Sequence, residues 1–105
     1  MEIERWRKEI DELDEELLRL LNMRARLAVK VGSLKRASGM PVRDRDREQF
    51  VLDRLQQANR GPLDQEAVLR LFRRIIKESR RAEALAVEQL KTTPVASLPK
   101  LRGIA

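Results

Sequence analysis

The segment Trp6–Leu34, WRKEIDELDEELLRLLNMRARLAVKVGSL, has the strongest structural pattern in this chain of 105 residues. Its apolar residues recur at spacings of three and four, which is the period of an amphipathic α-helix. The pattern predicts one helix from about residue 3 to about residue 37. The helix should end at Ser38-Gly39-Met40-Pro41, since Gly suits a C-cap and Pro cannot continue a helix. The apolar stripe consists of Trp6, Ile10, Leu13, Leu17, Leu20, Leu21, Leu27, Val31 and Leu34.

The length of this helix predicts a second copy of the chain. At about 1.5 Å per residue it would be roughly 50 Å long, whereas a compact domain of this size has a radius of gyration near 13 Å. One end would protrude beyond its own core and leave its apolar stripe bare. An antiparallel pairing of two long helices is the simplest closed arrangement that covers both stripes.

Two shorter helices follow in the sequence. The first should run from about residue 44 to about residue 58, before the breaker Asn59-Arg60-Gly61-Pro62. The next should start near Asp64, a residue that caps helices well, and run to about residue 90. The predicted fold is therefore all-α, with three helices, one of them very long, in a homodimeric bundle. Residues 1–90 form the helical domain, and residues 91–105 form a tail or linker.

The composition excludes several classes of function. The chain has no Cys and no His, so disulfides, most zinc sites and every Ser–His or Cys–His nucleophile are excluded. The absence of Cys agrees with a cytoplasmic protein, since the cytosol is reducing. No apolar run reaches the length of a membrane span, and the amino terminus lacks a signal-peptide core. A net charge of +6 permits attraction to nucleic acids, phosphates or carboxylates without choosing between them.

Charged and polar residues also lie on the apolar stripes, where an unpaired charge is costly to bury. At about 100° per residue, Arg24 falls at the angle of Trp6, and Lys35 falls within about 20° of it. A carboxyl group at the centre of an apolar face should have a raised pKa unless a cation pairs with it. An interhelical salt bridge could explain any single charged residue on a stripe. Residues of this kind recur on all three predicted helices, however, and together they predict a pocket for a small charged molecule. They are Arg24, Lys35, Asp44, Arg47, Glu48, Ser79 and Glu83.

The chemistry open to such a pocket is limited. The sequence contains no metal-binding constellation, no phosphate-binding Gly-rich loop and no activated nucleophile. Cationic binding of carboxylates, hydrogen bonding and shape remain. These suit a reaction catalysed by orientation and electrostatic stabilisation, without metal or cofactor.

These residues resemble the all-helical class of chorismate mutases over about residues 3–90. The match is carried by Arg7, Ile10, Asp11, Leu13-Asp14, by Val31-Gly32-Ser33-Leu34-Lys35, by Pro41-Val42-Arg43-Asp44-Arg45-Asp46-Arg47-Glu48, and by Leu71-Phe72, Ile75-Ile76 and Ser79. The resemblance implies an intertwined homodimer that converts chorismate to prephenate in the shikimate pathway to Phe and Tyr. It implies no cofactor and no covalent intermediate.

The resemblance also implies a role for each residue of the pocket. Arg24, and Arg7 of the partner subunit, would bind the two substrate carboxylates, as suits charge-assisted Arg contacts. Ser79 would add a hydrogen bond to a carboxylate. Glu48, with the backbone near Asp44, would hold the substrate hydroxyl, and Arg47 would orient that region.

The remaining roles concern the bond that breaks. Lys35 and Glu83 would flank the ether oxygen, where negative charge grows in the transition state, so that Lys35, Glu83 and Arg24 are the predicted catalytic residues. Val31 and Ile76 would be apolar walls.

Two positions depart from some members of the family. Some relatives carry Gln at the position of Glu83, and a carboxylate cannot donate to the ether oxygen, so Glu83 must be protonated. Activity should then fall as pH rises, and Glu83→Gln should retain activity at high pH. Arg80 stands where some relatives have a small apolar residue, and it either contacts a carboxylate or points outward.

Other functions remain open on the sequence. The Gly61-Pro62 turn and the Pro-containing extension resemble mutase domains fused ahead of a 3-deoxy-arabino-heptulosonate 7-phosphate synthase, where the pocket can serve as a regulatory sensor of chorismate or prephenate. An isochorismate-pyruvate lyase shares the fold. A basic nucleic-acid-binding module is disfavoured by interspersed acids and scarce aromatics. The expected partners are chorismate and prephenate, a second copy of the chain and the fused synthase, with no nucleic acid and no membrane.

Overall fold

The computed structural model describes residues 1–92 of the chain, with the side chains of residues 1–90. Three helices make up this part: α1, Glu2–Ala37; α2, Arg45–Ala58; and α3, Gln65–Thr92. The prediction of an all-α fold with one very long helix is confirmed, and each predicted boundary lies within about two residues of the observed one. Most of the expected tail of residues 91–105 lies outside the described residues.

Capping residues explain where α2 and α3 begin. The Asp44 side chain accepts a hydrogen bond from the backbone N–H of Arg47 at 2.9 Å, and Asp64 accepts one from Ala67 at 2.7 Å. Such caps satisfy backbone donors that the first helical turn leaves unpaired. Asp44 is therefore the extended N-cap of α2 rather than its first helical residue, with φ of −127°.

The end of α1 depends on a glycine. Gly39, two residues beyond the helix, has a φ of +71°, and its N–H bonds back to the carbonyl of Arg36. Only residues without a Cβ adopt this left-handed conformation at little cost, so Gly39 reverses the chain here. The turn directs the loop of residues 38–44 toward α2.

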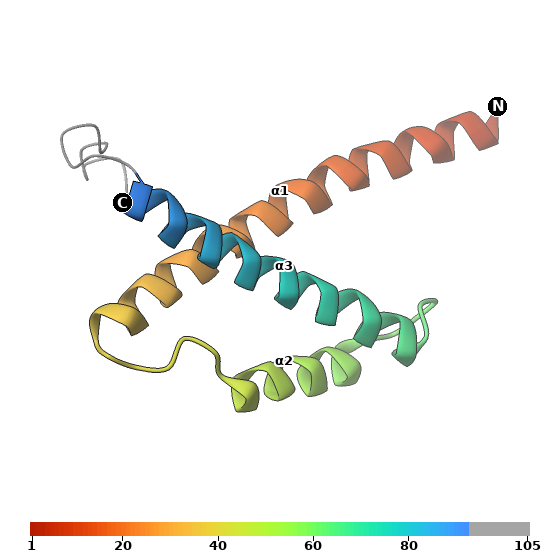
Figure 1. Cartoon of the computed structure of the whole chain (residues 1–105). Coiled ribbons are helices and arrows are strands. Elements are labelled where there is room, and N and C mark those ends of the chain that lie inside the picture. Colours follow the sequence, from red (N-terminus) through yellow and green to blue (C-terminus); the bar gives the residue numbers. More distant parts are fainter. Residues whose placement is uncertain (93–105) are drawn as a thin grey trace.

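The arrangement of the helices leaves one end of α1 without neighbours. α3 packs against both α1 and α2, and Figure 1 shows α3 crossing the C-terminal half of α1 while the N-terminal half projects from the body. The described chain measures 56 × 34 × 21 Å, with a radius of gyration of 17.7 Å. We call residues 1–21 the α1 arm.

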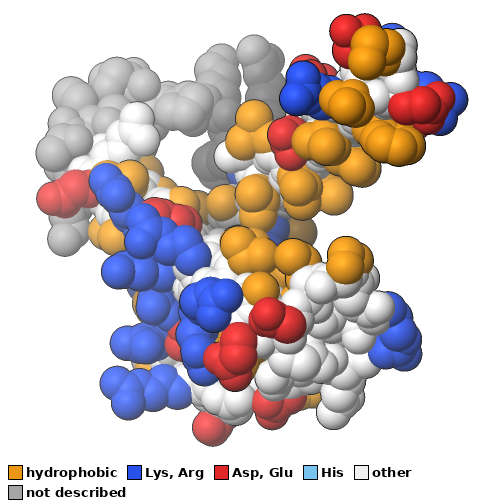
Figure 2. Space-filling view, turned by 90° about the vertical axis from the view of Figure 1, so that its right-hand side faces the viewer, with side chains coloured by type: hydrophobic (Ala, Val, Ile, Leu, Met, Phe, Trp, Pro, Cys, Tyr) orange, Lys and Arg blue, Asp and Glu red, His pale blue; other side chains and the backbone are white. Residues whose placement is uncertain are grey.

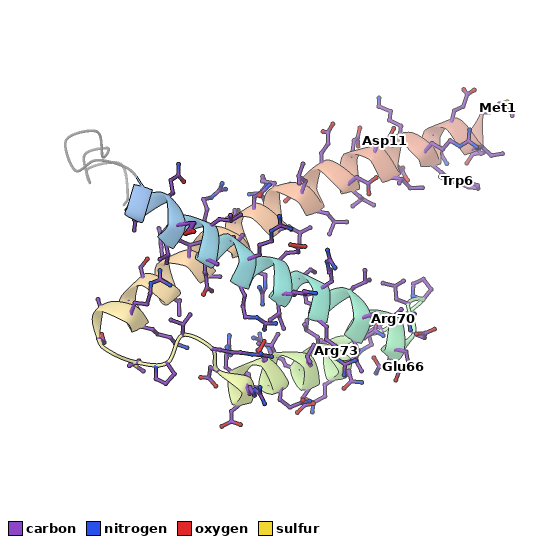
Figure 3. The ribbon with its side chains drawn as sticks, viewed as in Figure 1. Met1, Trp6, Asp11, Glu66, Arg70 and Arg73 are labelled. Atoms are coloured by element: carbon purple, nitrogen blue, oxygen red, sulfur yellow. The ribbon has the colours of Figure 1, made fainter. Side chains whose placement is uncertain are left out.

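The core of the single chain is small. Leu52, Val68 and Ile76 are its buried hydrophobic side chains. By contrast, Trp6 is 53% and Leu13 is 62% exposed on the α1 arm. Figure 2 shows apolar side chains gathered along the projecting part of the molecule, and Figure 3 shows Trp6 and Asp11 on opposite sides of the arm. The amphipathic stripe predicted from the sequence is therefore present but uncovered in one chain.

Within the described residues, no helix combines the length and the apolar character needed to cross a bilayer.

Candidate active site

A cavity of about 290 Å³ lies where α1, the start of α2 and the middle of α3 meet. Its volume is at the lower end of the range for small-molecule sites, about 300 Å³ and above. Every site residue predicted from the sequence lines it except Arg7. These residues are Arg24, Val31, Lys35, Asp44, Arg47, Glu48, Ile76, Ser79 and Glu83.

Arg24 is held at the α1–α3 side of the cavity. Its Nη1 donates a hydrogen bond to the Ser79 Oγ at 3.0 Å, and Ser79 is only 6% exposed. Burial, and then the positive charge of Arg47, lower the pKa of Arg24. No carboxylate of the described residues lies within ion-pair distance of Arg24, so its charge is available to an anionic ligand.

The carboxylates at the start of α2 are already partnered. Lys35 Nζ lies 4.0 Å from Asp44 Oδ2, while the other Asp44 oxygen caps the helix. Glu48 accepts a hydrogen bond from Arg80 on α3 and a longer one, 3.4 Å, from Arg43. Glu48 is thus oriented from two sides at the edge of the cavity.

Glu83 lies against the backbone of α1 at Gly32. A Cβ added at Gly32 would stand 2.9 Å from the Glu83 Oε2, which is closer than side chains tolerate. Burial raises the pKa of Glu83, and the positive charges of Arg36, Lys35 and Arg80 oppose that rise. The close approach therefore favours a protonated carboxyl group more than an exposed position would.

Two features of this site are not predicted by the sequence pattern. Gly32 approaches Glu83, and the signal that could have found it is an isolated glycine inside the predicted first helix. Arg43 bonds Glu48 and lines the cavity, although it does not lie on an apolar stripe. The orientation of Arg80, left open above, is inward, because this side chain lines the cavity and pairs with Glu48.

Arg7 does not reach the cavity of its own chain. It lies on the exposed α1 arm, 17 residues before Arg24, which is about 25 Å along the helix. A role for Arg7 therefore requires the cavity of a second copy.

The charges around the cavity favour an anionic ligand. Arg24, Lys35, Arg43, Arg47 and Arg80 line it together with three carboxyl groups, an excess of two positive charges when every group is ionised. Apolar walls complete it, and no group of three acidic side chains among the described residues is spaced to hold a metal ion. The arrangement can bind a dianion and aim hydrogen-bond donors at it.

Comparison with known proteins gives consistent results. The profile of the chorismate mutase type II family matches residues 6–84. A solved chorismate mutase from Thermus thermophilus (form II) superposes with a TM-score of 0.78 and 38% identity, over 80% of this chain and 96% of that chain.

Curated relatives include longer enzymes. The bifunctional chorismate mutase/prephenate dehydratase of Neisseria gonorrhoeae is 47% identical over 83 residues, 79% of this chain but 21% of that protein. A chorismate mutase from Methanocaldococcus jannaschii is 29% identical over 79% of this chain and 85% of its own length. The chain thus spans about a fifth of the length of the bifunctional relatives.

Proposed function

The chain belongs to the type II chorismate mutase family, and from that premise we propose that it converts chorismate to prephenate by an intramolecular Claisen rearrangement. The observation that carries the proposal is the half-buried, unpaired Arg24, oriented by Ser79 inside a cavity with at least two excess positive charges. Chorismate is a dianion with one hydroxyl group and one ether oxygen, and the cavity offers a partner for each.

Substrate binding follows from the charges that remain free. Arg24 would pair with one carboxylate of chorismate, and Ser79 would hold the guanidinium while adding its own hydrogen bond. The Glu48 carboxylate, at the other side of the cavity, would accept the substrate hydroxyl near Asp44. Arg47, which stacks on Phe50 with its guanidinium carbon 5.3 Å from the ring centre, would orient that side.

Catalysis would come from donors aimed at the ether oxygen. In the rearrangement the C–O bond breaks as a new C–C bond forms, and negative charge grows on that oxygen. Lys35 and a protonated Glu83 would stabilise this charge more in the transition state than in the ground state. The raised pKa of Glu83 supports the second donor. Val31 and Ile76 would hold the substrate compact, which shortens the path to the transition state.

A second copy of the chain would complete the site. Leu27 and Val31 line the cavity but remain 59% and 54% exposed, so its α1 side is open in one chain. The apolar stripe of another copy's α1 arm would cover it and bring Arg7 of the partner subunit to the second carboxylate. This is the intertwined dimer expected from the sequence.

Charge along α1 supports an antiparallel pairing. The arm, residues 1–21, carries eight carboxylates and four cations, whereas residues 22–37 carry five cations and no carboxylate. Two antiparallel copies would place the acidic half of each helix beside the basic half of the other, and a parallel pair would place like charges together.

The direct test is to mix the purified protein with chorismate, follow its loss across a pH series and identify the product. We expect prephenate, with a rate that falls at high pH. Salicylate and pyruvate formed from isochorismate would indicate the lyase instead. Binding without turnover would indicate a regulatory domain. If the protein neither binds nor converts chorismate, the charges on the stripes are explained as interhelical salt bridges.

The shared site has its own test. The variants Arg7→Ala and Arg24→Ala should each be nearly inactive, but mixing them through unfolding and refolding should restore about a quarter of the activity, because half the dimers would contain one intact site. No recovery on mixing would contradict a site built from two chains.

The predicted fusion to a synthase finds no support in the bifunctional relatives, whose second activity is that of a prephenate dehydratase. If a further catalytic domain accompanies this chain, those relatives favour the dehydratase. The division into residues 1–90 and a tail of residues 91–105 stays a prediction.

A further inference from the structure

We propose that Arg80 is a positioning residue that holds the Glu48 carboxylate in place for the substrate hydroxyl. The contact that carries this inference joins two helices: Nη1 of Arg80 on α3 donates to Oε1 of Glu48 on α2. The proposal rests on the proposed function, because it assigns Arg80 a role in the same reaction.

The geometry of α3 explains why Arg80 reaches α2. Ser79 and Glu83 are four residues apart and therefore share a face of α3, which points to α1 at Arg24 and Gly32. Arg80 lies about 100° further round the helix, and this rotation directs it to Glu48. One turn of α3 thus supplies both sides of the cavity.

The environment of Glu48 makes Arg80 its main anchor. Arg43 also bonds Glu48, but its side chain is 55% exposed, it lies in the loop before α2, and its bond is 3.4 Å long. The Arg80 side chain is 34% exposed and extends from the middle of a long helix. A bond from a fixed helix and a less exposed side chain restricts Glu48 more than a bond from an exposed loop residue.

Holding Glu48 in advance has a catalytic consequence. A free glutamate side chain samples several rotamers, and ordering it on binding costs free energy. When Arg80 has already ordered the carboxylate, the substrate hydroxyl meets an acceptor in the required position. Removal of Arg80 should therefore weaken the hydrogen bond between the Glu48 carboxylate and the substrate hydroxyl while leaving Arg24 and Ser79 in place.

The charge of Arg80 provides a second readout. Glu83 faces Lys35 and Arg36 on α1 and Arg80 on its own helix, and all three cations oppose the rise of its pKa. Loss of the Arg80 charge should raise the pKa of Glu83 further. The protonated, active form would then persist to higher pH, and the alkaline loss of activity would shift upward.

The experiment compares Arg80→Leu and Arg80→Lys with Arg81→Leu as the matched control. Arg81 is the exposed neighbour of Arg80 and does not line the cavity. We expect Arg80→Leu to lower kcat/KM about ten- to a hundredfold, the range for losing a hydrogen bond between charged groups. It should also move the alkaline fall in activity to higher pH. Arg80→Lys should recover part of the rate and return this fall to its original pH, and Arg81→Leu should match the unmodified protein.

A double-mutant cycle tests whether Arg80 acts through Glu48. In a Glu48→Ala background, and at a pH below the pKa of Glu83, Arg80→Leu should change kcat/KM less than about threefold, because the group that Arg80 positions is already absent. Additive losses at that pH would show that Arg80 acts independently of Glu48 and would overturn the proposal. If thermal unfolding shows that Arg80→Leu does not fold, Arg80→Gln takes its place in the same cycle.

The two proposals fail in different ways. Prephenate formation by the unmodified protein tests the proposed function alone, and its absence would overturn both. Turnover by the unmodified protein, with equal rates and equal pH profiles for Arg80→Leu and Arg81→Leu, would overturn the role of Arg80 and leave the proposed function standing.

Discussion

The two halves of α1 obey the same helical period but have different surroundings. In the α1 arm the apolar stripe is continuous, and most of its residues, such as Leu13 and Leu17, are more than half exposed. In residues 22–37 the stripe is interrupted by Arg24 and Lys35, and α3 packs against it to form the cavity. An uninterrupted apolar stripe therefore indicates a surface that another copy or partner would cover, whereas cations on a stripe indicate a candidate site.

The two halves of α1 also differ in the contacts that a single chain provides. The cavity already has its hydrogen bond from Arg24 to Ser79 and its paired Glu48. The arm has exposed apolar side chains and ion pairs between residues of the same helix, such as Arg19 with Glu16. Changes in the cavity should therefore act on the reaction, and changes of the apolar residues in the arm should act first on assembly.

The largest effect should come from breaking the cavity at Arg24. Arg24→Ala removes the unpaired cation and should lower kcat/KM roughly a thousandfold, in line with the loss of a partly buried charge contact, while the proposed dimer persists. Steady-state kinetics and sedimentation measure the two quantities. The exposed neighbour Arg26, changed to Ala, serves as the control, and a comparable loss there would contradict a specific role for Arg24.

The next effect should come from breaking the arm. Leu13→Glu combined with Leu17→Glu places two charges on the stripe and should halve the mass in sedimentation. Activity should fall about a hundredfold, because Arg7 of the partner subunit would be withdrawn. Asp11→Asn with Glu15→Gln alters the opposite side of the arm and should leave both quantities unchanged. An active monomer with the two Leu changes would show that the arm plays no part in the site.

A smaller effect is expected where α1 meets Glu83. Gly32→Ala would place a Cβ 2.9 Å from the Glu83 Oε2, so the carboxyl group must shift. We expect kcat/KM to fall about tenfold, with a small loss of stability of roughly 1 to 3 kcal/mol from overpacking. Ser33→Ala, at the exposed next position, is the control. Full activity in Gly32→Ala would show that the position of Glu83 is not critical.

The smallest effect, at pH values below the pKa of Glu83, should be that of Glu83→Gln. Burial raises the pKa of Glu83, and only its protonated form donates, so the activity of the unmodified protein should fall as pH rises through that pKa. The amide donates at every pH and should remove this fall, with a change of less than about threefold at low pH. Glu78→Gln, on the same helix but outside the cavity, should keep the original profile. If the loss of activity at high pH persists in Glu83→Gln, the group whose deprotonation causes that loss is not Glu83.

Much of the fold could be predicted because helices are local structures. The spacing of apolar residues, the caps Asp44 and Asp64, and the Gly-containing breaks lie within a few positions of the helix ends that they determine. The same periodicity predicts which charges lie on the apolar stripes. Every site residue that was predicted to act within its own chain lines the cavity.

The contacts between helices could not be predicted in this way. The period of a helix gives the angle of Arg80 about its axis, but the distance to Glu48 depends on how closely α3 approaches α2. The angle of Glu83 likewise does not show that Gly32 opens space for its carboxyl group. Each of these depends on residues more than 30 positions apart, which no local pattern relates.

Three helices, the exposed stripe of the arm and the set of charges that line the cavity can all be predicted from the amino-acid sequence, because they follow from local backbone preferences and from the cost of burying charge. Which of these charges pair with each other and which stay free depends on the packing of the helices. Glu48 is paired with Arg80, whereas Arg24 retains its charge for a ligand. That difference arises from the packing of α3 between α1 and α2, which brings each side chain within or beyond hydrogen-bond distance of a partner.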